Sequence, residues 1–248
     1  MKRTIEPQPV VSRRRALGFL GGAAALAVGC GNGSPTGASN AASGSSGSSG
    51  TATGTSCAVT AEETAGPYPD RLGMLDTPAF YRQDITEGRS GTPLALSLTI
   101  VNSRSGCAGL AGAAVEIWQC DAAGNYSEYS QPGYNGTGQT FLRGLQVTDA
   151  SGRVTFNTIY PGWYMGRATH IHVQVFVNRA LVKTTQVAFP EDVTRQVYAQ
   201  GVYAPKGQNS TTNSSDNVFA DGTATEMASV SGSATAGYAA ALTIAVAA

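Results

Sequence analysis

The sequence predicts an all-β fold, a sandwich or barrel with at most one short helix. Several short segments alternate apolar and polar residues with a period of two, as half-buried strands do. Clusters of Gly, Asn, Asp and Ser separate these segments at a spacing typical of all-β domains. The strand-like segments are residues 94–101, 113–119, 140–147, 153–159, 170–176 and 182–188.

Three further segments complete the predicted elements. Residues 149–152 form a turn signal between two of the strands. A helix is expected at 191–200, where Pro190 precedes two acidic residues that favour a helix N-terminus. The Ala-rich tail is compatible with a last strand from Tyr238. No internal repeat is evident.

Residues 1–30 have the pattern of an export signal. Three arginines at 13–15 precede an apolar run at 17–28, which is too short to span a bilayer as a permanent helix. The paired arginines favour the twin-arginine route, and an ordinary secretory signal is the alternative. Cys30 follows small residues in a pattern similar to a lipoprotein cleavage site, which would tether the protein to a membrane surface through Cys30.

The rest of the chain divides into a linker and one domain. Residues 31–56 carry no charge and no large apolar side chain, which predicts a flexible linker before a compact domain at 57–248. The leader holds five of the sixteen basic residues and one of the sixteen acidic residues, so the remainder has eleven basic and fifteen acidic residues. This balance argues against a nucleic-acid partner, which requires clustered Lys and Arg.

Three cysteines follow the leader, and in an oxidising compartment two of them could form a disulfide. Spacing alone does not fix the pair. We favour Cys57 with Cys107, because both lie in irregular segments. Cys120 ends a predicted strand and is compatible with a buried free thiol.

The chain has only two histidines, His170 and His172, at the start of a predicted strand. Residues two apart on a strand point to the same face, so the two imidazoles could bind one metal ion. Such a pair could equally be an ordinary surface feature. The histidines alone therefore leave a metal site open.

Two tyrosines in predicted loops extend this possibility. Tyr126 follows a turn-like stretch, and Tyr164 precedes the histidines. A phenol, whose pKa is near 10, becomes a metal ligand only beside a strongly acidic ion such as ferric iron. Two phenolates and a hydroxide would neutralise that ion, and two imidazoles would complete its shell. Either tyrosine could instead be a packing residue with its hydroxyl at the surface.

Six ordered runs carry a more specific pattern: residues 64–68, 112–127, 142–144, 148–156, 158–164 and 167–172. Together they resemble the intradiol ring-cleavage dioxygenases, which include catechol 1,2-dioxygenases and protocatechuate 3,4-dioxygenases. The resemblance covers roughly residues 57–220. With the strand pattern, it predicts an immunoglobulin- or prealbumin-like β-sandwich with long active-site loops.

The resemblance implies a cofactor, a reaction and a set of residues. Fe(3+) would be bound by four ligands, with the second tyrosine and the second histidine axial: Tyr126, Tyr164, His170 and His172. Arg167 would stabilise negative charge on the substrate ring, and Gln186 would line the same pocket. The implied reaction is cleavage of a catechol-type diol by O2 to a cis,cis-muconate-type dicarboxylate. From the residues alone, Arg167 could also be a surface ion-pair residue and Gln186 a polar strand residue.

Two departures from the family pattern indicate a small exported member with an open site. Only five residues separate Tyr164 from His170, and no long N-terminal helical dimerisation segment is evident. The diol and the oligomeric state, including a homodimer, therefore stay open. Two other functions also remain: a noncatalytic β-sandwich that binds a ligand or polysaccharide on a surface tether, and a copper or zinc protein that uses the histidine pair.

Overall fold

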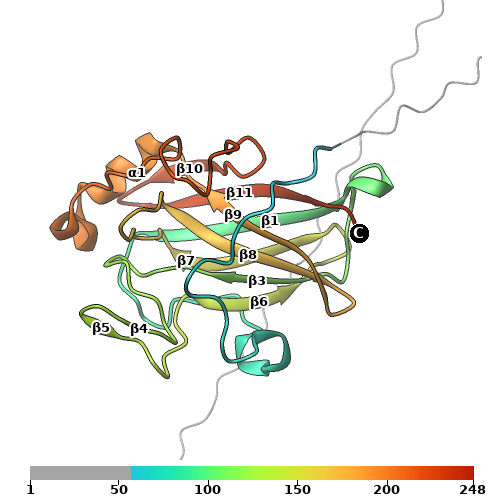
Figure 1. Cartoon of the computed structure of the whole chain (residues 1–248), viewed down its shortest axis with the longest axis horizontal. Helices are drawn as coiled ribbons and strands as arrows, with labels where there is room; N and C mark the ends of the chain where they lie inside the picture. The colour runs from blue at the N-terminus through green and yellow to red at the C-terminus, as the bar shows by residue number, and fades with distance from the viewer. Residues whose placement is uncertain (1–56) are drawn as a thin grey trace, which may run out of the picture. The chain divides into compact units, whose positions relative to one another are not determined.

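The computed structural model describes residues 57–248, in which two sheets pack face to face (Figure 1). The strands of the first sheet are β1 (Pro93–Asn102), β2 (Ala108–Gly109), β7 (Arg153–Ile159), β10 (Ser229–Ser233) and β11 (Gly237–Val246). This sheet is mixed. β1 runs parallel to β11 and antiparallel to β2 and β7, and β10 pairs antiparallel with β11.

The second sheet is antiparallel and carries both histidines. Its strands in spatial order are β6 (Arg143–Val147), β3 (Ala114–Trp118), β8 (His170–Val177) and β9 (Ala180–Ala188). A separate small hairpin consists of β4 (Ser130–Gln131) and β5 (Tyr134–Asn135). One long connection joins β3 to β6 within this sheet. Another leads from β7 of the first sheet to the start of β8 (Figure 1).

Alternating apolar residues of the two sheets form one core between them. Leu96 and Leu98 of β1 belong to the same buried cluster as Val115 of β3 and Val173 of β8. The residues between these positions point away from that core, as the period of two requires. The predicted all-β sandwich is therefore confirmed.

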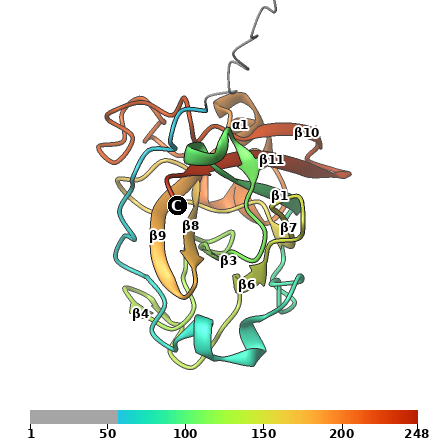
Figure 2. The same cartoon turned by 90° about the vertical axis from the view of Figure 1, so that its right-hand side faces the viewer.

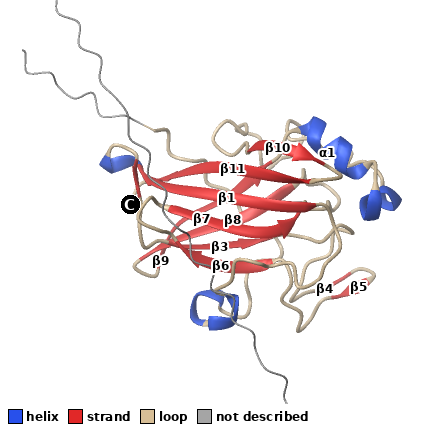
Figure 3. Ribbon diagram, turned by 180° about the vertical axis from the view of Figure 1, so that it is seen from behind, coloured by secondary structure: helices blue, strands red, loops and turns tan. Residues whose placement is uncertain are grey.

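The described residues contain little helical structure, which is coloured blue in Figure 3. Residues 57–248 contain one α-helix, α1 (Glu191–Tyr198), which buries Val197 and Tyr198. Glu191 and Asp192 lie in its first turn, where negative charge is favourable. The 3-10 turns are η1 (Met74–Asp76), η2 (Pro78–Phe80), η3 (Ser103–Ser105) and η4 (Gly201–Lys206). No helix in this part of the chain is long and apolar enough to cross a membrane.

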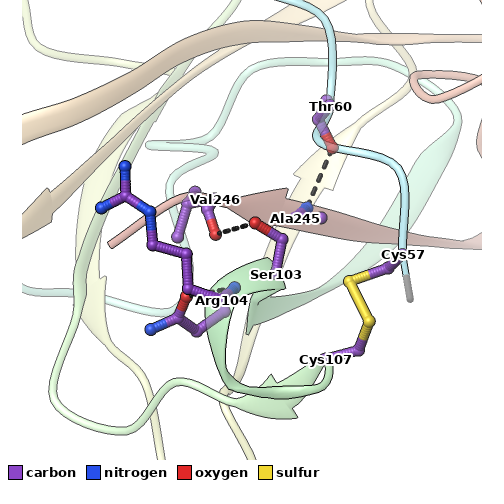
Figure 4. The surroundings of a disulfide bond; sticks show 8 residues. Cys57, Thr60, Ser103, Arg104, Cys107, Ala245 and Val246 are labelled. Carbon is purple, nitrogen blue, oxygen red and sulfur yellow. Dashed lines mark hydrogen bonds between the residues drawn. A yellow bond between two sulfur atoms is a disulfide. The ribbon is translucent and has the colours of Figure 1, made fainter. Parts of the chain in front are cut away.

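The segment 57–68, which we call the strap, runs along β9 (Figure 2). Its backbone is fixed at two points: Thr60 N–H donates to Ala245 O at 3.0 Å, and Glu63 N–H donates to Thr184 O at 2.8 Å. A disulfide between Cys57 and Cys107 anchors its start (Figure 4). The strap thus joins both sheets, since Ala245 lies in β11 and Thr184 in β9.

The cysteine predictions are confirmed. Cys57 pairs with Cys107 across a sequence separation of 50. Cys120 is a buried free thiol, and burial raises its pKa to about 12. The disulfide leaves Cys120 as a small apolar packing residue next to Tyr126 and Trp118.

The predicted strands occur within a few residues of their expected bounds, with one correction. The strand expected at 140–147 begins at Arg143, because Leu142 has a left-handed φ of 55° and donates its N–H to Ile85 O at 2.7 Å. The expected helix ends at Tyr198 rather than at residue 200. The export signal at 1–30 and the linker at 31–56 lie outside the described residues.

Candidate active site

The two histidines lie on the outer face of the second sheet. Ile171 and Val173 of β8 point into the core, so His170 and His172 point to the opposite face. Both imidazoles are nevertheless buried, with 3% and 0% of each residue exposed. The strap and the loops that lead into the sheet must therefore cover them.

His172 occupies the middle of a row of side chains that crosses all four strands. The strand register places Trp118 beside His172 on one side and Gln186 on the other, and Arg143 lies beyond Trp118. The indole and imidazole rings stack with centroids 4.7 Å apart and an interplanar angle of 5°. This stacking fixes the plane of the imidazole ring.

Gly66 of the strap lies close to the His172 ring. A Cβ at Gly66 would lie 2.9 Å from His172 Cε1, and the residue has a positive φ of 67°. Both facts favour glycine at this position. The backbone of the strap thus lies against the imidazole ring and restricts the access of water to His172.

The imidazole nitrogens face each other. His170 Nδ1 lies 2.6 Å from Ala168 O, and because a carbonyl only accepts, Nδ1 carries the proton. His170 Nε2 is therefore bare, and it lies 3.1 Å from His172 Nε2. Burial and the nearby Arg167 lower the pKa of His170 to about 3. Burial and His170 lower the pKa of His172 well below its usual value, so both rings are neutral at neutral pH.

The two predicted tyrosines meet this pair from separate loops. Tyr164 Oη lies 3.5 Å from His170 Nε2, and the rings of Tyr126 and Tyr164 meet edge to face at 5.7 Å. Tyr126 is fully buried, and its hydroxyl has no hydrogen-bond partner. Burial raises the pKa of Tyr126 well above 10 and that of Tyr164 to about 12. The structure therefore brings all four predicted ligands together.

A tight turn places Tyr126. Asp121 accepts hydrogen bonds from Ala123 N–H at 3.0 Å and Asn125 N–H at 2.9 Å, and Gly124 has a left-handed φ of 87°. Asx turns of this kind satisfy backbone donors within the loop itself. The turn-like stretch read from the sequence is thus the element that directs Tyr126 inward.

Arg167 and Gln186 lie together, as predicted. Arg167 Nη2 donates to Gln186 Oε1 at 2.5 Å, and Gln186 Nε2 donates to Thr64 O of the strap at 3.0 Å. Arg167 also forms a nearly buried ion pair with Asp216, with Nε 2.9 Å from Oδ2. Asp216 and Gln186 thus hold the guanidinium of Arg167, and Thr64 holds Gln186 in turn.

Asp216 was not identified from the sequence. Its carboxylate is fully buried and also accepts the N–H of Ala168 at 2.7 Å. It lies 49 residues after Arg167, in a stretch of Asn, Ser and Thr that predicts only a loop. No local pattern could have shown which cation it pairs with.

Tyr68 was also missed as a site residue, although its segment carries part of the family resemblance. Its ring centroid lies 4.7 Å from that of Tyr126 and 6.0 Å from that of Tyr164. Arg143 Nη2 donates to the Tyr68 carbonyl at 3.0 Å, which holds this end of the strap. Tyr68 therefore forms one wall beside both predicted tyrosine ligands.

The side chains around the two histidines could bind a metal ion. Residues 57–248 contain no group of three or more His, Cys, Asp or Glu side chains placed to hold one. The side chains that lie next to the histidines include the phenols of Tyr126 and Tyr164, whose oxygens are further possible donors. The unpartnered Tyr126 hydroxyl, the Tyr164 hydroxyl and two neutral imidazoles supply such donors, and this set suits a small, highly charged cation.

Comparisons with known proteins identify relatives of this chain. A family model described as dioxygenase matches residues 66–204, which is 139 of the 248 residues. An intradiol ring-cleavage dioxygenase from Tetranychus urticae has a similar structure, with a TM-score of 0.69 and 28% identity over 77% of this chain and 95% of that one. A comparison with curated proteins gave no match.

Two further structures are similar. One is the dioxygenase domain of a dioxygenase carbohydrate-binding protein fusion from Streptomyces sp. SirexAA-E, with a TM-score of 0.55 and 27% identity over 76% of this chain and 97% of that one. The other, 3-chlorocatechol 1,2-dioxygenase from Rhodococcus opacus 1CP, is 22% identical over 75% of this chain and 72% of that one. Its TM-score is 0.50, and it supports the fold alone.

The matched region contains all six residues predicted for the site, from Tyr126 to Gln186. The family match, the sandwich fold and the ring-cleavage dioxygenase structures lead to the same assignment. This chain belongs to the intradiol ring-cleavage dioxygenases.

Proposed function

We propose that the protein uses nonhaem Fe(III) to cleave a catechol-type diol with O2 to a cis,cis-muconate-type dicarboxylate. The proposed iron ligands are Tyr126, Tyr164, His170 and His172. The observation that carries the proposal is the hydroxyl of Tyr126, which is buried without a hydrogen-bond partner beside two neutral imidazoles. An unpartnered buried hydroxyl destabilises the fold by about 1–3 kcal/mol, and a cation at this place would offset that loss.

The charges of the donor set favour a trivalent ion. Phenols with raised pKa values stay protonated unless a strongly acidic cation lies next to them. When bound, Fe(III) would ionise both phenols and draw electron density from a chelated diol, which activates the ring towards O2. Two phenolates and one hydroxide would balance its three positive charges, and the neutral imidazoles would add no charge.

Tyr164 is suited to accept a proton from the substrate. It is only half-buried, whereas Tyr126 is fully buried, so an incoming diol can reach Tyr164 from solvent. With a pKa of about 12 as a free phenol, Tyr164 Oη would retain a transferred proton at neutral pH. Tyr126 would meanwhile keep its place within the buried cluster of Trp118 and Met74.

Arg167 would stabilise negative charge that develops on the ring. Its guanidinium is held by Asp216 and Gln186, so it needs no reorganisation when the charge appears. Arg167 remains 11% exposed on the side chain, whereas Asp216 is fully covered. The positive charge therefore faces the open side of the pair.

The segment that follows Tyr164 is exposed to solvent. Met165, the first residue of the five-residue connection to His170, is 91% exposed. A short connection with an exposed apolar side chain leaves room for substituents on the diol ring. We therefore include substituted phenolic diols among the proposed substrates.

The reaction class is tested by labelling with ¹⁸O2. Catechol, protocatechuate and hydroxyquinol are each incubated with the purified full chain, and the product mass is measured. We expect a ring-opened dicarboxylate that contains two labelled oxygen atoms. Tyr126→Phe should abolish turnover, whereas Tyr81→Phe, at an exposed tyrosine on the surface, should retain it. A product with one or no labelled atom would contradict the proposal.

We also propose that the protein is exported and tethered at a membrane surface through Cys30. The leader pattern supports export, and the Cys57–Cys107 disulfide is typical of oxidising compartments. Cell fractionation tests this proposal, because Cys30→Ser should move the protein from the membrane fraction to the soluble exported fraction. A cytoplasmic location of the wild-type protein would contradict it.

A further inference from the structure

Lys206 connects the two loops that carry the tyrosines. It ends η4 and is half-buried. Its Nζ donates to the carbonyl oxygen of Ala123, three residues before Tyr126, and to that of Trp163, which directly precedes Tyr164. No carboxylate lies within ion-pair distance of Lys206 in residues 57–248. Its ammonium group therefore binds backbone carbonyls rather than an acidic partner.

The two loops are in direct contact at this point. A Cβ on Gly124 would lie 2.2 Å from both Lys206 Nζ and Trp163 O, and a Cβ on Gly162 would lie 2.2 Å from Asp121 O. Only glycines allow the two backbones to approach so closely. Several carbonyl oxygens therefore converge, and their mutual repulsion favours a cation between them.

Further contacts fix Lys206 and the Tyr164 loop to each other. Lys206 Nζ lies 4.7 Å from the centre of the Trp163 ring, a cation–π contact. Trp163 Nε1 donates to Gly207 O at 3.1 Å, and Asn209 Nδ2 donates to Arg167 O at 2.8 Å. The segment 206–209 thus holds the Tyr164 loop at both ends.

The base of this segment is rigid. Tyr203 of η4 is buried, and its hydroxyl donates to Tyr160 O at 2.6 Å and accepts the Thr92 N–H at 3.2 Å. Lys206 therefore projects from a turn that is anchored in the main core. The family match ends at residue 204, so Lys206 and Asn209 lie beyond it.

We propose that Lys206 is a positioning residue that sets the separation of the Tyr126 and Tyr164 hydroxyls, and thereby the binding of the metal. This inference rests on the proposed function, in which both phenols are ligands. Loss of the ammonium group would release the two carbonyls and let the loops move apart. Tyr164, the less buried phenol, would then be bound less firmly.

The test compares Lys206→Met with Lys206→Arg, which can still donate to two carbonyls. Arg104→Met is the matched control, because Arg104 is exposed next to the disulfide (Figure 4) and its loss removes the same charge without touching a residue of the proposed site. We measure the iron content, the rate of iron loss to a chelator and the phenolate-to-iron absorption band. Lys206→Met should lose iron at least about tenfold faster and show a shifted band, while Lys206→Arg and Arg104→Met should resemble the wild type.

The wild-type measurements distinguish a failure of the proposed iron site from a failure of the inference about Lys206. If wild-type protein binds no iron, the proposed function fails. If wild-type protein has the band and Lys206→Met has the same band and iron retention, only the inference about Lys206 fails. A lower thermal stability with an unchanged band would also overturn it, since that result indicates a purely structural role. Should Lys206→Met not fold, Lys206→Gln replaces it, and wild-type behaviour of that variant would again overturn the inference.

Discussion

At the scale of single residues, two buried tyrosine hydroxyls differ in their hydrogen bonds, and this difference distinguishes a residue of the proposed site from a residue that stabilises the fold. The Tyr126 hydroxyl is buried and unpartnered, whereas the equally buried Tyr203 hydroxyl bonds to both Tyr160 and Thr92. A buried hydroxyl with partners stabilises a protein by about 1 kcal/mol, and one without partners destabilises it. Replacing Tyr by Phe at these two positions should therefore affect the free energy of unfolding differently.

We accordingly predict that Tyr126→Phe leaves the free energy of unfolding of the metal-free protein unchanged or raises it by about 1 kcal/mol. Tyr203→Phe should lower it by about 1 kcal/mol or more. Denaturant titrations of the stripped proteins measure both values. A loss of stability in Tyr126→Phe equal to that in Tyr203→Phe would show that the Tyr126 hydroxyl has a partner.

Asp216 tests the role of Arg167. Because this ion pair is nearly buried, we expect Asp216→Asn to lower the free energy of unfolding by about 3 kcal/mol. Catalytic turnover should fall about tenfold or more, because Arg167 loses its fixed orientation. The matched control is Asp76→Asn, which breaks the exposed pair with Arg179 and should change stability by no more than about 1 kcal/mol. Equal effects of the two variants on turnover would contradict this role.

At the scale of elements, the strap links the disulfide to the site. Its first residue, Cys57, is anchored to Cys107, while Gly66 and Tyr68 pack on His172 and Tyr126. Between these ends, Lys183 Nζ donates to Thr60 O at 2.8 Å and Glu62 accepts the Thr184 N–H at 3.0 Å. The strap therefore fixes one wall of the site from a distant covalent anchor.

We predict that removing the disulfide in a Cys57→Ala, Cys107→Ala double variant lowers the free energy of unfolding by about 3–4 kcal/mol. Hydrogen exchange in the strap should become faster, since one of its anchors is lost. Reductant should have the same effect on the wild type and none on the double variant. Cys120→Ala, at the free thiol, is the control for the loss of a sulfur atom and should leave the reductant effect intact.

Strand β3 carries a buried carboxyl group, Glu116, on the outer face of its sheet. Burial, and secondarily Asp70, raise the pKa of Glu116 to about 7. A raised folded-state pKa means that the neutral form stabilises the protein below the unfolded value of about 4.5, and that this stability is lost as the pH rises through about 7. Glu116 therefore makes the fold weaker on the alkaline side.

We predict that Glu116→Gln equals the wild type in stability at pH 4.5 and exceeds it by up to about 3 kcal/mol at pH 8. Denaturant titrations at the two pH values measure the difference. Glu87→Gln, which removes a surface partner of Arg82, is the control and should have a small effect at both. A Glu116→Gln curve parallel to that of the wild type would refute the prediction.

At the scale of the whole molecule, the period-two pattern predicted β1 and β7 of the first sheet and all four strands of the second sheet. It did not predict β2, β4 and β5, which have two residues each, or β10, which consists of Ser, Gly and one Val. Such segments become strands through their neighbours rather than through their own composition. The parallel pairing of β11 with β1 likewise depends on contacts that are distant in the sequence.

The site residues likewise divide into those that the sequence predicted and those that depend on contacts distant in the sequence. The spacing of His170 and His172 predicted one shared face, and the family resemblance indicated Tyr126, Tyr164, Arg167 and Gln186. Asp216 and Lys206 could not be predicted, because the partners that tie them to the site lie 43 to 83 residues away and are in part backbone carbonyls. Local pattern predicts which residues share a strand face, whereas the residues that fix the loops emerge only from the three-dimensional structure.

The central claim is that two phenols and two imidazoles bind ferric iron. The most direct test is the visible absorption spectrum of the purified full chain, measured with its metal content and repeated after anaerobic addition of catechol. We expect about one iron per chain and a red to burgundy phenolate-to-iron band that shifts when the diol binds. Bound zinc or copper in place of iron, or bound iron without this band, would contradict the claim.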